Sequence, residues 1–286
     1  MIEIQDKTQC CGCGACAQSC PKRCITMHED IEGFLYPDIN KANCIDCGLC
    51  EKVCPFINPY SPLRPQHTFA AINPDQDIRK NSSSGGIFYL LASTVLKDGG
   101  VVFGAVFNDT WEVEIKETEI IPDIKRMQGS KYVQANTLDS FRKCKSILDS
   151  GRKVLYTGTP CHVSGLRHFL RKDYHNLYLV DFVCHGTPSP RVWKSYINEI
   201  QDALSIIRIG NKPKRRPICL SSRFSLSYDN DCNNYYLYAS YTDNDYMRLF
   251  LNNTNLRPSC FSCKVKGCSS NSDITIGNTS VSKLTS

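Results

Sequence analysis

Two copies of one cysteine pattern constrain this chain more than any other feature. The pattern C-x2-C-x2-C-x3-C-P is formed by Cys10, Cys13, Cys16 and Cys20, and again by Cys44, Cys47, Cys50 and Cys54. Three thiolates at this spacing can wrap one face of an iron–sulfur cubane, and the fourth points away from it. A zinc site, the alternative, takes four ligands in two pairs and would leave thiolates unused. The doubled run therefore predicts two [4Fe–4S] clusters.

In two-cluster ferredoxins the fourth cysteine of each run binds the other cluster. We therefore assign Cys10, Cys13, Cys16 and Cys54 to one cluster, and Cys44, Cys47, Cys50 and Cys20 to the second. This crossed ligation predicts one pseudo-symmetric ferredoxin domain over residues 1–58. Cys11 and Cys24 lie outside the pattern and are expected to be small packed residues.

The cysteine distribution also indicates a compartment and a second domain. Ten of the 18 cysteines precede residue 60 in a chain of 286 residues, a length typical of about two domains. The N-terminus lacks the apolar segment of a secretory signal, so we expect a reducing, cytoplasmic location, where cysteines serve metal binding or redox chemistry. No apolar run is long enough for a membrane span. The net charge of +6 is too mild to indicate a nucleic-acid partner.

A Pro-rich linker over residues 59–67 is followed by alternating helix and strand patterns. Helices are expected at Ile87–Lys97, Leu138–Leu148, Val163–Leu170 and Val192–Leu204; strands are expected at Val101–Phe107, Val113–Glu119, Val154–Thr157, Leu177–Val183, Ile206–Ile209, Ile218–Ser227 and Tyr235–Tyr241. The alternation predicts an α/β part with a partly parallel sheet, and the later strands predict an α+β second half. The whole chain is thus expected to be of the α+β class.

Two further groups of residues have the composition of binding sites. The loop Asn81–Gly86 precedes the expected helix at Ile87, so it is either a cradle for a phosphate or flavin edge or an ordinary helix start. Cys161 and Cys184 each follow an expected strand, and Cys260 and Cys263 form a later pair. These four cysteines could bind a third cluster, or they could be buried thiols plus a small zinc knuckle. His162 and His185, next to two of these cysteines, are candidates to support the ligands.

The ordered set of motifs resembles the coenzyme F-420 hydrogenase/dehydrogenase beta-subunit family. After the paired cysteine runs, the motifs are Ser82–Gly86, Gly129–Gln134, Gly158–Cys161, Asp181–Gly186, Arg257–Cys263 and Ser272–Gly277. The resemblance implies an iron–sulfur flavoprotein oxidoreductase that passes electrons between [4Fe–4S] clusters and a flavin, FAD or FMN. In archaeal relatives the electrons pass on to the deazaflavin coenzyme F-420.

The resemblance also implies site residues and a division of the chain. Flavin contacts are expected from Ser83, Ser84, Gly85, Gly86, Ser130, Lys131 and Tyr132, and a third [4Fe–4S] cluster from Cys161, Cys184, Cys260 and Cys263. The flavoprotein-like part is expected to comprise an N-terminal domain, residues 68–142, and a C-terminal domain, residues 143–286. Expected partners are a redox protein or a two-electron carrier, in a hetero- or homo-oligomer.

The sequence departs from the family pattern after Gly277. Relatives continue through a Gly-Asp-Phe-Trp-Gly stretch, whereas this chain continues with Asn278, Thr279 and Ser280 and stops at Ser286, so we expect an incomplete C-terminal domain. A flavin pocket that needs the missing segment would be weakened. The alternative function is therefore a non-catalytic electron-transfer subunit, with a zinc-stabilised interaction module as a more distant third.

Overall fold

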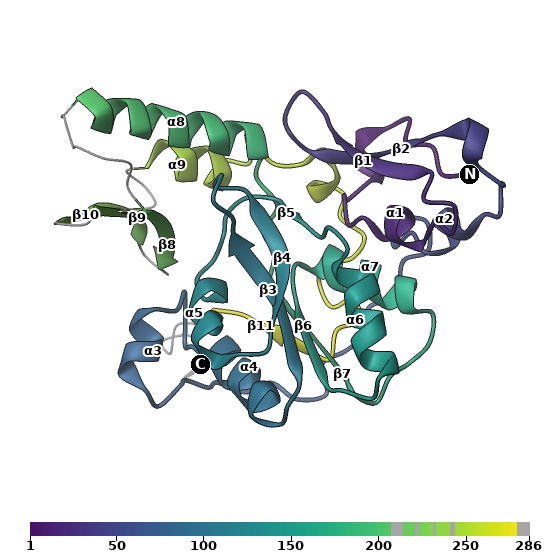
Figure 1. Ribbon diagram of the computed structural model, residues 1–286, viewed down its shortest axis with the longest axis horizontal. Coiled ribbons are helices and arrows are strands. Elements are labelled where there is room, and N and C mark those ends of the chain that lie inside the picture. The colour runs from purple at the N-terminus through teal and green to yellow at the C-terminus, as the bar shows by residue number, and fades with distance from the viewer. Residues whose placement is uncertain (207–213, 221–222, 231–232, 241–243, 279–286) are drawn as a thin grey trace.

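A computed structural model describes residues 1–206, 214–220, 223–230, 233–240 and 244–278 of the protein. The N-terminal segment lies beside a larger α/β body, and a three-stranded antiparallel sheet lies on the opposite side of that body (Figure 1). The expected mixture of helices and strands is thus confirmed. Within these described ranges, no helix combines the length and the apolar character needed to cross a membrane.

The N-terminal segment consists of two similar halves. Its elements are η1 Lys7–Gln9, α1 Ala15–Ser19, β1 Ile25–Glu29, β2 Leu35–Ile39, η2 Lys41–Asn43 and α2 Leu49–Lys52. Each cysteine motif leads into a short helix whose N-cap is a glycine with positive φ, Gly14 at +74° and Gly48 at +69°. Glycine adopts this left-handed conformation without strain, so a helix can begin directly after the second cysteine of each motif. The antiparallel pair β1–β2 connects the two halves.

A six-stranded sheet forms the centre of the α/β body. Its strands are β3 Val101–Phe107, β4 Val113–Thr118, β5 Ala135–Asn136, β6 Val154–Thr157, β7 Leu177–Phe182 and β11 Ile274–Ile276. The spatial order is β11-β7-β6-β3-β4-β5. Strands β11, β7, β6 and β3 are parallel, whereas β4 is antiparallel to β3. The carboxyl ends of the four parallel strands therefore lie at one edge, where open α/β sheets bind ligands.

Helices cover both faces of this sheet. Helices α4 Ile87–Lys97 and α5 Ile124–Met127 pack on one face, and α6 Ser140–Asp149 and α7 Pro160–Leu170 on the other. The other helices of this part are α3 Gln76–Lys80, η3 Ile121–Asp123, α8 Pro190–Ile206, α9 Asp245–Leu251 and η4 Pro258–Cys260. Side chains of β3 alternate between two cores, as the period of a pleated strand requires. Val101 and Phe103 pack in a large core with α6 and α7, and Val102 and Val106 pack in a smaller core with α4 and α5.

The large core extends beyond the sheet in two directions. It includes Trp193 of α8 and Tyr246 of α9 on one side, and Cys13 and Phe56 of the N-terminal segment on the other. The N-terminal segment therefore shares an apolar core with the α/β body, in addition to any surface contacts.

Hydrogen bonds from α6 and the turn before it fix the N-terminal segment in place. Thr137 Oγ1 donates to the Cys13 carbonyl at 3.0 Å, and the Phe141 amide donates to Gln18 Oε1 at 2.9 Å. Arg142 Nε donates to the Gln18 carbonyl at 2.7 Å. Helix α1 is thus held against α6 by main-chain as well as side-chain atoms.

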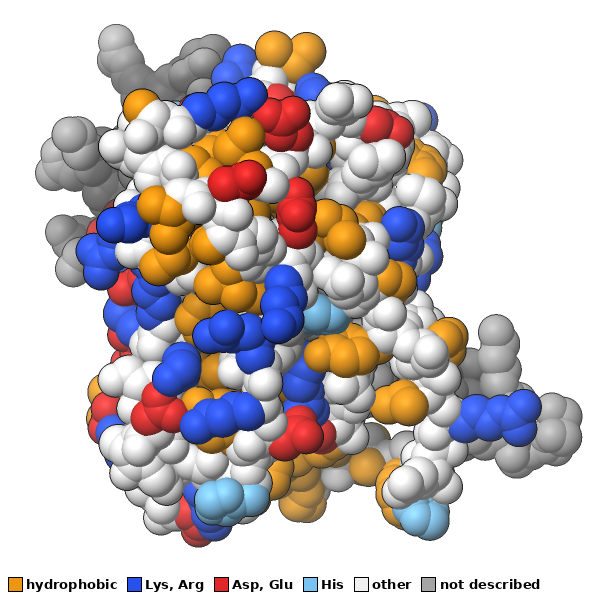
Figure 2. Space-filling model, turned by 90° about the vertical axis from the view of Figure 1, so that its right-hand side faces the viewer, with side chains coloured by type: hydrophobic (Ala, Val, Ile, Leu, Met, Phe, Trp, Pro, Cys, Tyr) orange, Lys and Arg blue, Asp and Glu red, His pale blue; other side chains and the backbone are white. Residues whose placement is uncertain are grey.

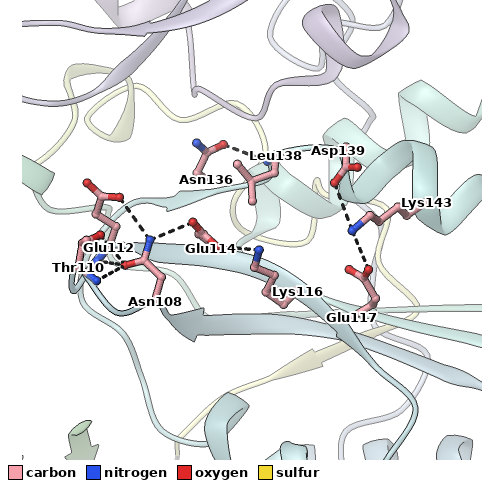
Figure 3. Close-up of polar contacts among 10 residues, drawn as sticks. All are labelled: Asn108, Thr110, Glu112, Glu114, Lys116, Glu117, Asn136, Leu138, Asp139 and Lys143. Carbon is pink, nitrogen blue, oxygen red and sulfur yellow. Dashed lines mark hydrogen bonds and ion pairs between the residues drawn. The ribbon is translucent and has the colours of Figure 1, made fainter. Parts of the chain in front are cut away.

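Polar contacts in turn orient α6 against the sheet (Figure 3). The Lys143 ammonium bridges Glu117 of β4 at 2.7 Å and Asp139 at 3.6 Å. The turn at Leu138, with φ of +47°, is held by Asn136 Oδ1, which accepts a hydrogen bond from the Leu138 amide at 2.9 Å. The start of α6 is therefore anchored on both β4 and β5.

Charges of both signs are interspersed on the face formed by the N-terminal segment, α6 and α7 (Figure 2). Examples near the ends of α6 and α7 are the ion pairs of Asp149 with Lys172 at 3.4 Å and of Arg167 with Asp173 at 3.3 Å. Exposed pairs of this kind contribute at most about 1 kcal/mol each. The shared apolar core is therefore the main source of cohesion on this side of the molecule.

Most of the expected elements are confirmed. Ile87–Lys97, Val101–Phe107 and Val154–Thr157 begin and end as predicted, in α4, β3 and β6. The remaining expected elements confirmed with shifted ends are Val113–Glu119, Leu138–Leu148, Val163–Leu170, Leu177–Val183, Val192–Leu204 and Tyr235–Tyr241, which correspond to β4, α6, α7, β7, α8 and β10 Asn233–Ser240. Local periodicity therefore indicates these elements correctly.

Two expected strands differ from the described elements. Ile206 is the last residue of α8, and 207–209 lie outside the described residues. Ile218–Ser227 spans parts of two strands, β8 Lys214–Leu220 and β9 Arg223–Asn230, which pair with each other while β9 also pairs with β10. Apolar residues recur with a period of two through both strands, so the alternation alone does not distinguish one long strand from a hairpin.

Candidate iron-sulfur and cofactor site

The first cysteine set, Cys10, Cys13, Cys16 and Cys54, lies where α1 packs beside α2. Burial raises the pKa of the Cys16 thiol, and Cys10 and Cys54 raise it further by their charge. Burial likewise raises the pKa of Cys54, with a contribution from Cys10 and opposition from the amides of Phe56 and Ile57. Sulfur atoms gathered in this way need a positive counter-charge to be thiolates, and iron supplies one. The set therefore fits an iron–sulfur cluster.

The second set, Cys20, Cys44, Cys47 and Cys50, lines a small hollow. Cys50 Sγ accepts a hydrogen bond from the Ile2 amide at 3.4 Å, and Cys44 Sγ accepts one from the Asp46 amide at 3.4 Å. Amide donors favour the thiolate form that a cluster requires. Cys47 is exposed to solvent, so this set lies nearer the surface than the first.

Cys24, for which the sequence indicates only packing, lines the same hollow. Its Sγ lies 3.4 Å from Cys20 Sγ. Although burial opposes it, hydrogen bonds from Cys24 and from the main chain hold the pKa of Cys20 below its ordinary value. Cys24 is therefore a buried neighbour of this sulfur set, which its position in the sequence does not reveal.

A third set forms at the carboxyl edge of the sheet. Cys161 is the second residue of α7 after β6, Cys184 follows β7, and Cys260 and Cys263 belong to the loop around η4. Burial raises the pKa of the Cys184 thiol, and the charges of Cys161, Cys260 and Cys263 raise it further. The Thr187 amide donates to Cys260 Sγ at 3.3 Å, and Thr159 Oγ1 lies 3.1 Å from Cys161 Sγ. The structure thus brings together the four cysteines of the expected third site.

Cys11 lies between the first and third sets. It is buried in the same apolar core as Cys13, and Cys161 packs against that core. The neighbouring Cys13 thiol, together with burial, raises the pKa of Cys11 well above the ordinary value. Sequence reasoning missed this position because Cys11 and Cys161 are distant in the chain.

The Ser-Gly loop and the Ser130 segment lie side by side. Ser83 Oγ accepts a hydrogen bond from the Ser130 amide at 2.6 Å, and Ser84 Oγ donates to Asn278 Oδ1 at 3.1 Å, just beyond β11. The loop leads through Gly86, with φ of +75°, into α4, whose first turn has no side-chain cap. Uncapped helical amides and nearby hydroxyls are suited to an anionic group. The loop therefore fits the phosphate of a flavin.

Lys131 and Tyr132 continue this segment toward the cysteines. The Lys131 ammonium donates to the carbonyls of Gln128 at 2.8 Å and Gly129 at 3.1 Å. The Tyr132 ring centre lies 5.0 Å from that of Phe250, which lies 4.9 Å from that of His185. Since His185 follows Cys184, a row of aromatic rings connects the expected flavin contacts with the third set.

The two candidate histidines differ in environment. His162 is buried, and burial together with the charge of Arg257 lowers its pKa to about 4, so its ring is neutral. Its Nδ1 is buried without a partner among the described residues. His185 is exposed and packs edge-on against Phe250.

Of the remaining cysteines, Cys144 and Cys268 lie apart from these sets among the described residues. Cys144 is fully buried in α6, Cys268 lies beyond the third set, Cys219 belongs to β8, and Cys232 is outside the described residues. In the described part of the chain, no three His, Cys, Asp or Glu side chains are grouped so that they could hold one metal ion.

Paired cysteine motifs, docked on an α/β body that carries more cysteines at its strand ends, define an iron–sulfur electron-transfer protein. Residues 9–57 match the family model of the 4Fe-4S dicluster domain, and residues 151–286 match that of the C terminus of the coenzyme F-420 hydrogenase/dehydrogenase beta subunit. The C-terminal part of the chain is therefore similar to this beta-subunit family, and the dicluster domain lies before it in the sequence. The resemblance inferred from the motifs is thus confirmed.

A chain of the F-420-reducing nickel–iron hydrogenase complex from Methanosarcina barkeri is similar to this one, with a TM-score of 0.48 and 16% identity. The similarity covers 73% of this chain and 68% of that chain. No curated protein sequence matches this one.

Proposed function

We propose that the protein is an iron–sulfur flavoprotein oxidoreductase that passes electrons between [4Fe–4S] clusters and a flavin. The observation that supports this most directly is the continuity of the candidate sites. Cys11 and Cys13 share an apolar core against which Cys161 packs, and the rings of Tyr132, Phe250 and His185 extend from the third set to the flavin contacts. The first set, the third set and the expected flavin contacts thus adjoin one another.

In this proposal, twelve cysteines bind three clusters. Cys10, Cys13, Cys16 and Cys54 hold the first cluster; Cys20, Cys44, Cys47 and Cys50 hold the second; Cys161, Cys184, Cys260 and Cys263 hold the third. Mutual proximity of the sulfur atoms and amide hydrogen bonds to them support the assignment. The protein's own contribution is to exclude water from the first and third sets and to donate hydrogen bonds to sulfur.

The flavin, FAD or FMN, would be held by Ser83, Ser84, Gly85, Gly86, Ser130, Lys131 and Tyr132. The uncapped start of α4 favours a phosphate, and the Lys131 ammonium favours negative charge on a bound ring. A flavin accepts one or two electrons, whereas a cluster transfers one at a time. Electrons would leave to a two-electron carrier or substrate, which in archaeal relatives is coenzyme F-420, with a redox partner protein in an oligomer.

We propose the same division of the chain as the sequence predicts. Residues 1–58 carry two clusters, 59–67 are a linker, and 68–142 and 143–286 together form the flavoprotein part. The central sheet supports treating the last two as one working unit, because it takes β3, β4 and β5 from the first and β6, β7 and β11 from the second.

Anaerobic reconstitution of the full chain, followed by iron, sulfide, zinc and flavin analysis, tests this function. We expect about twelve irons and matching sulfide per chain, with flavin released on denaturation. About eight irons per chain would contradict the proposal of a third cluster. Clusters without flavin would favour a non-catalytic electron-transfer subunit. Stoichiometric zinc without labile sulfide would contradict the proposal.

A further inference from the structure

Arg257 is the largest fully buried side chain of the described residues. It is 1% exposed, although arginine is seldom buried unless its charge is paired. Its guanidinium donates to the carbonyl oxygens of Cys10 at 2.7 Å and Leu35 at 2.9 Å, and to Gln134 Oε1 at 3.0 Å. It also lies 4.1 Å from the ring centre of Tyr36. All of these partners are neutral groups.

The charge of Arg257 has no carboxylate beside it in the described part of the chain, where no ion pair within 4.0 Å includes it. A buried charge without an opposite charge costs several kcal/mol, and hydrogen bonds to carbonyl groups offset only part of that cost. The fold therefore places a cation where an anionic group is needed but no acidic side chain supplies it.

Two proposed cluster sites flank this cation. Its Nε binds the carbonyl of Cys10, a proposed ligand of the first cluster, and its own carbonyl accepts from the amide of Cys260, a proposed ligand of the third. Its charge also acts on Cys161, whose pKa it lowers against the stronger effects of Cys11 and burial. Four thiolates outweigh the positive charge of an iron–sulfur core, so a loaded site carries net negative charge.

The chain also makes room for this contact. Gly12, between Cys10 and Cys13, has φ of +71°, and a Cβ there would overlap the Gln134 amide and lie 2.9 Å from Arg257 Nη1. A residue without a side chain thus lets the guanidinium approach the first cysteine motif.

We propose that Arg257 is the buried counter-charge of the first and third cluster sites and that it raises their reduction potentials. The inference rests on the proposed cluster ligation. Reduction adds negative charge to a cluster, and a nearby buried cation stabilises that charge more than it stabilises the oxidised state. Arg257 is thus a positioning residue that acts through charge and binds no substrate.

The test is a redox titration of the anaerobically reconstituted full chain, followed by electron paramagnetic resonance. In Arg257→Gln, we expect at least one midpoint potential to fall by about 59 mV. For a one-electron couple this corresponds to a tenfold change in the equilibrium constant of reduction. Arg257→Lys keeps the charge and should retain most of the wild-type potential. Arg142→Gln is the matched control, because Arg142 also donates to carbonyls of the N-terminal segment but is only half-buried.

Three results would overturn the inference. The first is that the midpoint potentials are unchanged in Arg257→Gln at wild-type iron content. The second is that the midpoint potentials fall equally in Arg142→Gln. The third applies where Arg257→Gln does not retain clusters, and is a large fall of the midpoint potentials in Arg257→Lys. Arg257→Lys with potentials close to wild type supports it in that case. A wild-type chain that bound no iron and sulfide would contradict the proposed function itself, whereas absence of flavin alone leaves this comparison intact.

Discussion

Gly14 and Gly48 occupy the same position in the two cysteine motifs but have different surroundings. Both have positive φ and precede a short helix. A Cβ at Gly14 would lie 2.7 Å from Thr137 Oγ1, whereas a Cβ at Gly48 would meet nothing within 4 Å. Gly48 therefore tests only the need for positive φ, whereas Gly14 also tests the close approach of Thr137 from the α/β body.

We expect Gly48→Ala to cost about 1–2 kcal/mol, the penalty of a left-handed residue with a side chain. Gly14→Ala should cost at least about 1 kcal/mol more, because Thr137 must move and its hydrogen bond to Cys13 is disturbed. Anaerobic guanidinium unfolding of the loaded protein, followed by cluster absorbance, measures both. Equal losses in the two variants would show that docking through Thr137 adds no stability.

Thiol reactivity provides a second test at the level of single residues. Cys47 is exposed and is a proposed ligand, whereas Cys144 is fully buried and burial raises its pKa above the ordinary value. We therefore expect iodoacetamide to label Cys47 in the iron-stripped protein but not in the loaded one, because a metal-bound thiolate is protected. Cys144 should stay unlabelled in both, as measured by mass spectrometry. Equal labelling of Cys47 in both states would contradict its role as a ligand.

Helix α6 connects the N-terminal segment to the sheet by packing more than by charge. Phe141 is fully buried, and its ring centre lies 5.8 Å from those of Tyr156 and Phe169. Phe141→Ala should therefore cost about 3–5 kcal/mol. Lys143→Met, which removes the half-exposed ion pair with Glu117, should cost less than about 1 kcal/mol. Guanidinium unfolding of both variants checks this order. A larger loss of unfolding free energy in Lys143→Met than in Phe141→Ala would show that charge, and not packing, makes the connection.

The elements that the sequence predicts best are those whose signals are local. Strand β3 is a continuous apolar run between glycine and polar residues, and the apolar residues of α4 follow a helical period, so both were located to the residue. Strands β5 and β11 have only two and three residues and depend on partners far along the chain, β4 and β7. No local pattern could have revealed them.

The candidate site divides in the same way. The eight cysteines of the doubled motif are evident from spacing alone, and Cys161 and Cys184 follow strands that periodicity detects. The positions of Cys11 and Arg257 between cysteine sets depend on how α7 and the η4 loop fold back on the N-terminal segment. Such convergence is a property of tertiary structure, which one sequence does not encode in any short window.

At the scale of the whole molecule, the N-terminal segment and the α/β body differ in the apolar core that each would keep without metal. The small core of the N-terminal segment consists of Ile2, Cys16, Cys24, Ile25 and Cys50. Three of its five members are cysteines, two of them proposed ligands, so the core loses its centre when iron is removed. The α/β body keeps its own aliphatic and aromatic cores.

We therefore expect chelation of iron to unfold the N-terminal segment selectively. Hydrogen exchange of the stripped protein should become fast at β1 and β2, while β6 should keep its protection. Intact protection of β1 and β2 after complete removal of iron and sulfide would show that protein contacts alone maintain the segment. Loss of protection at β6 to the same extent would show that the two parts fold as one unit.

The different surroundings of the two cysteine motifs also give the molecule a direction. The first motif is buried against the α/β body, and the second lines a hollow with the exposed Cys47 beside it. The first cluster site is thus shielded from solvent, whereas the second is open to it. We therefore expect a diffusing electron carrier to make contact at the second motif, because Cys47 is exposed without any opening of the protein.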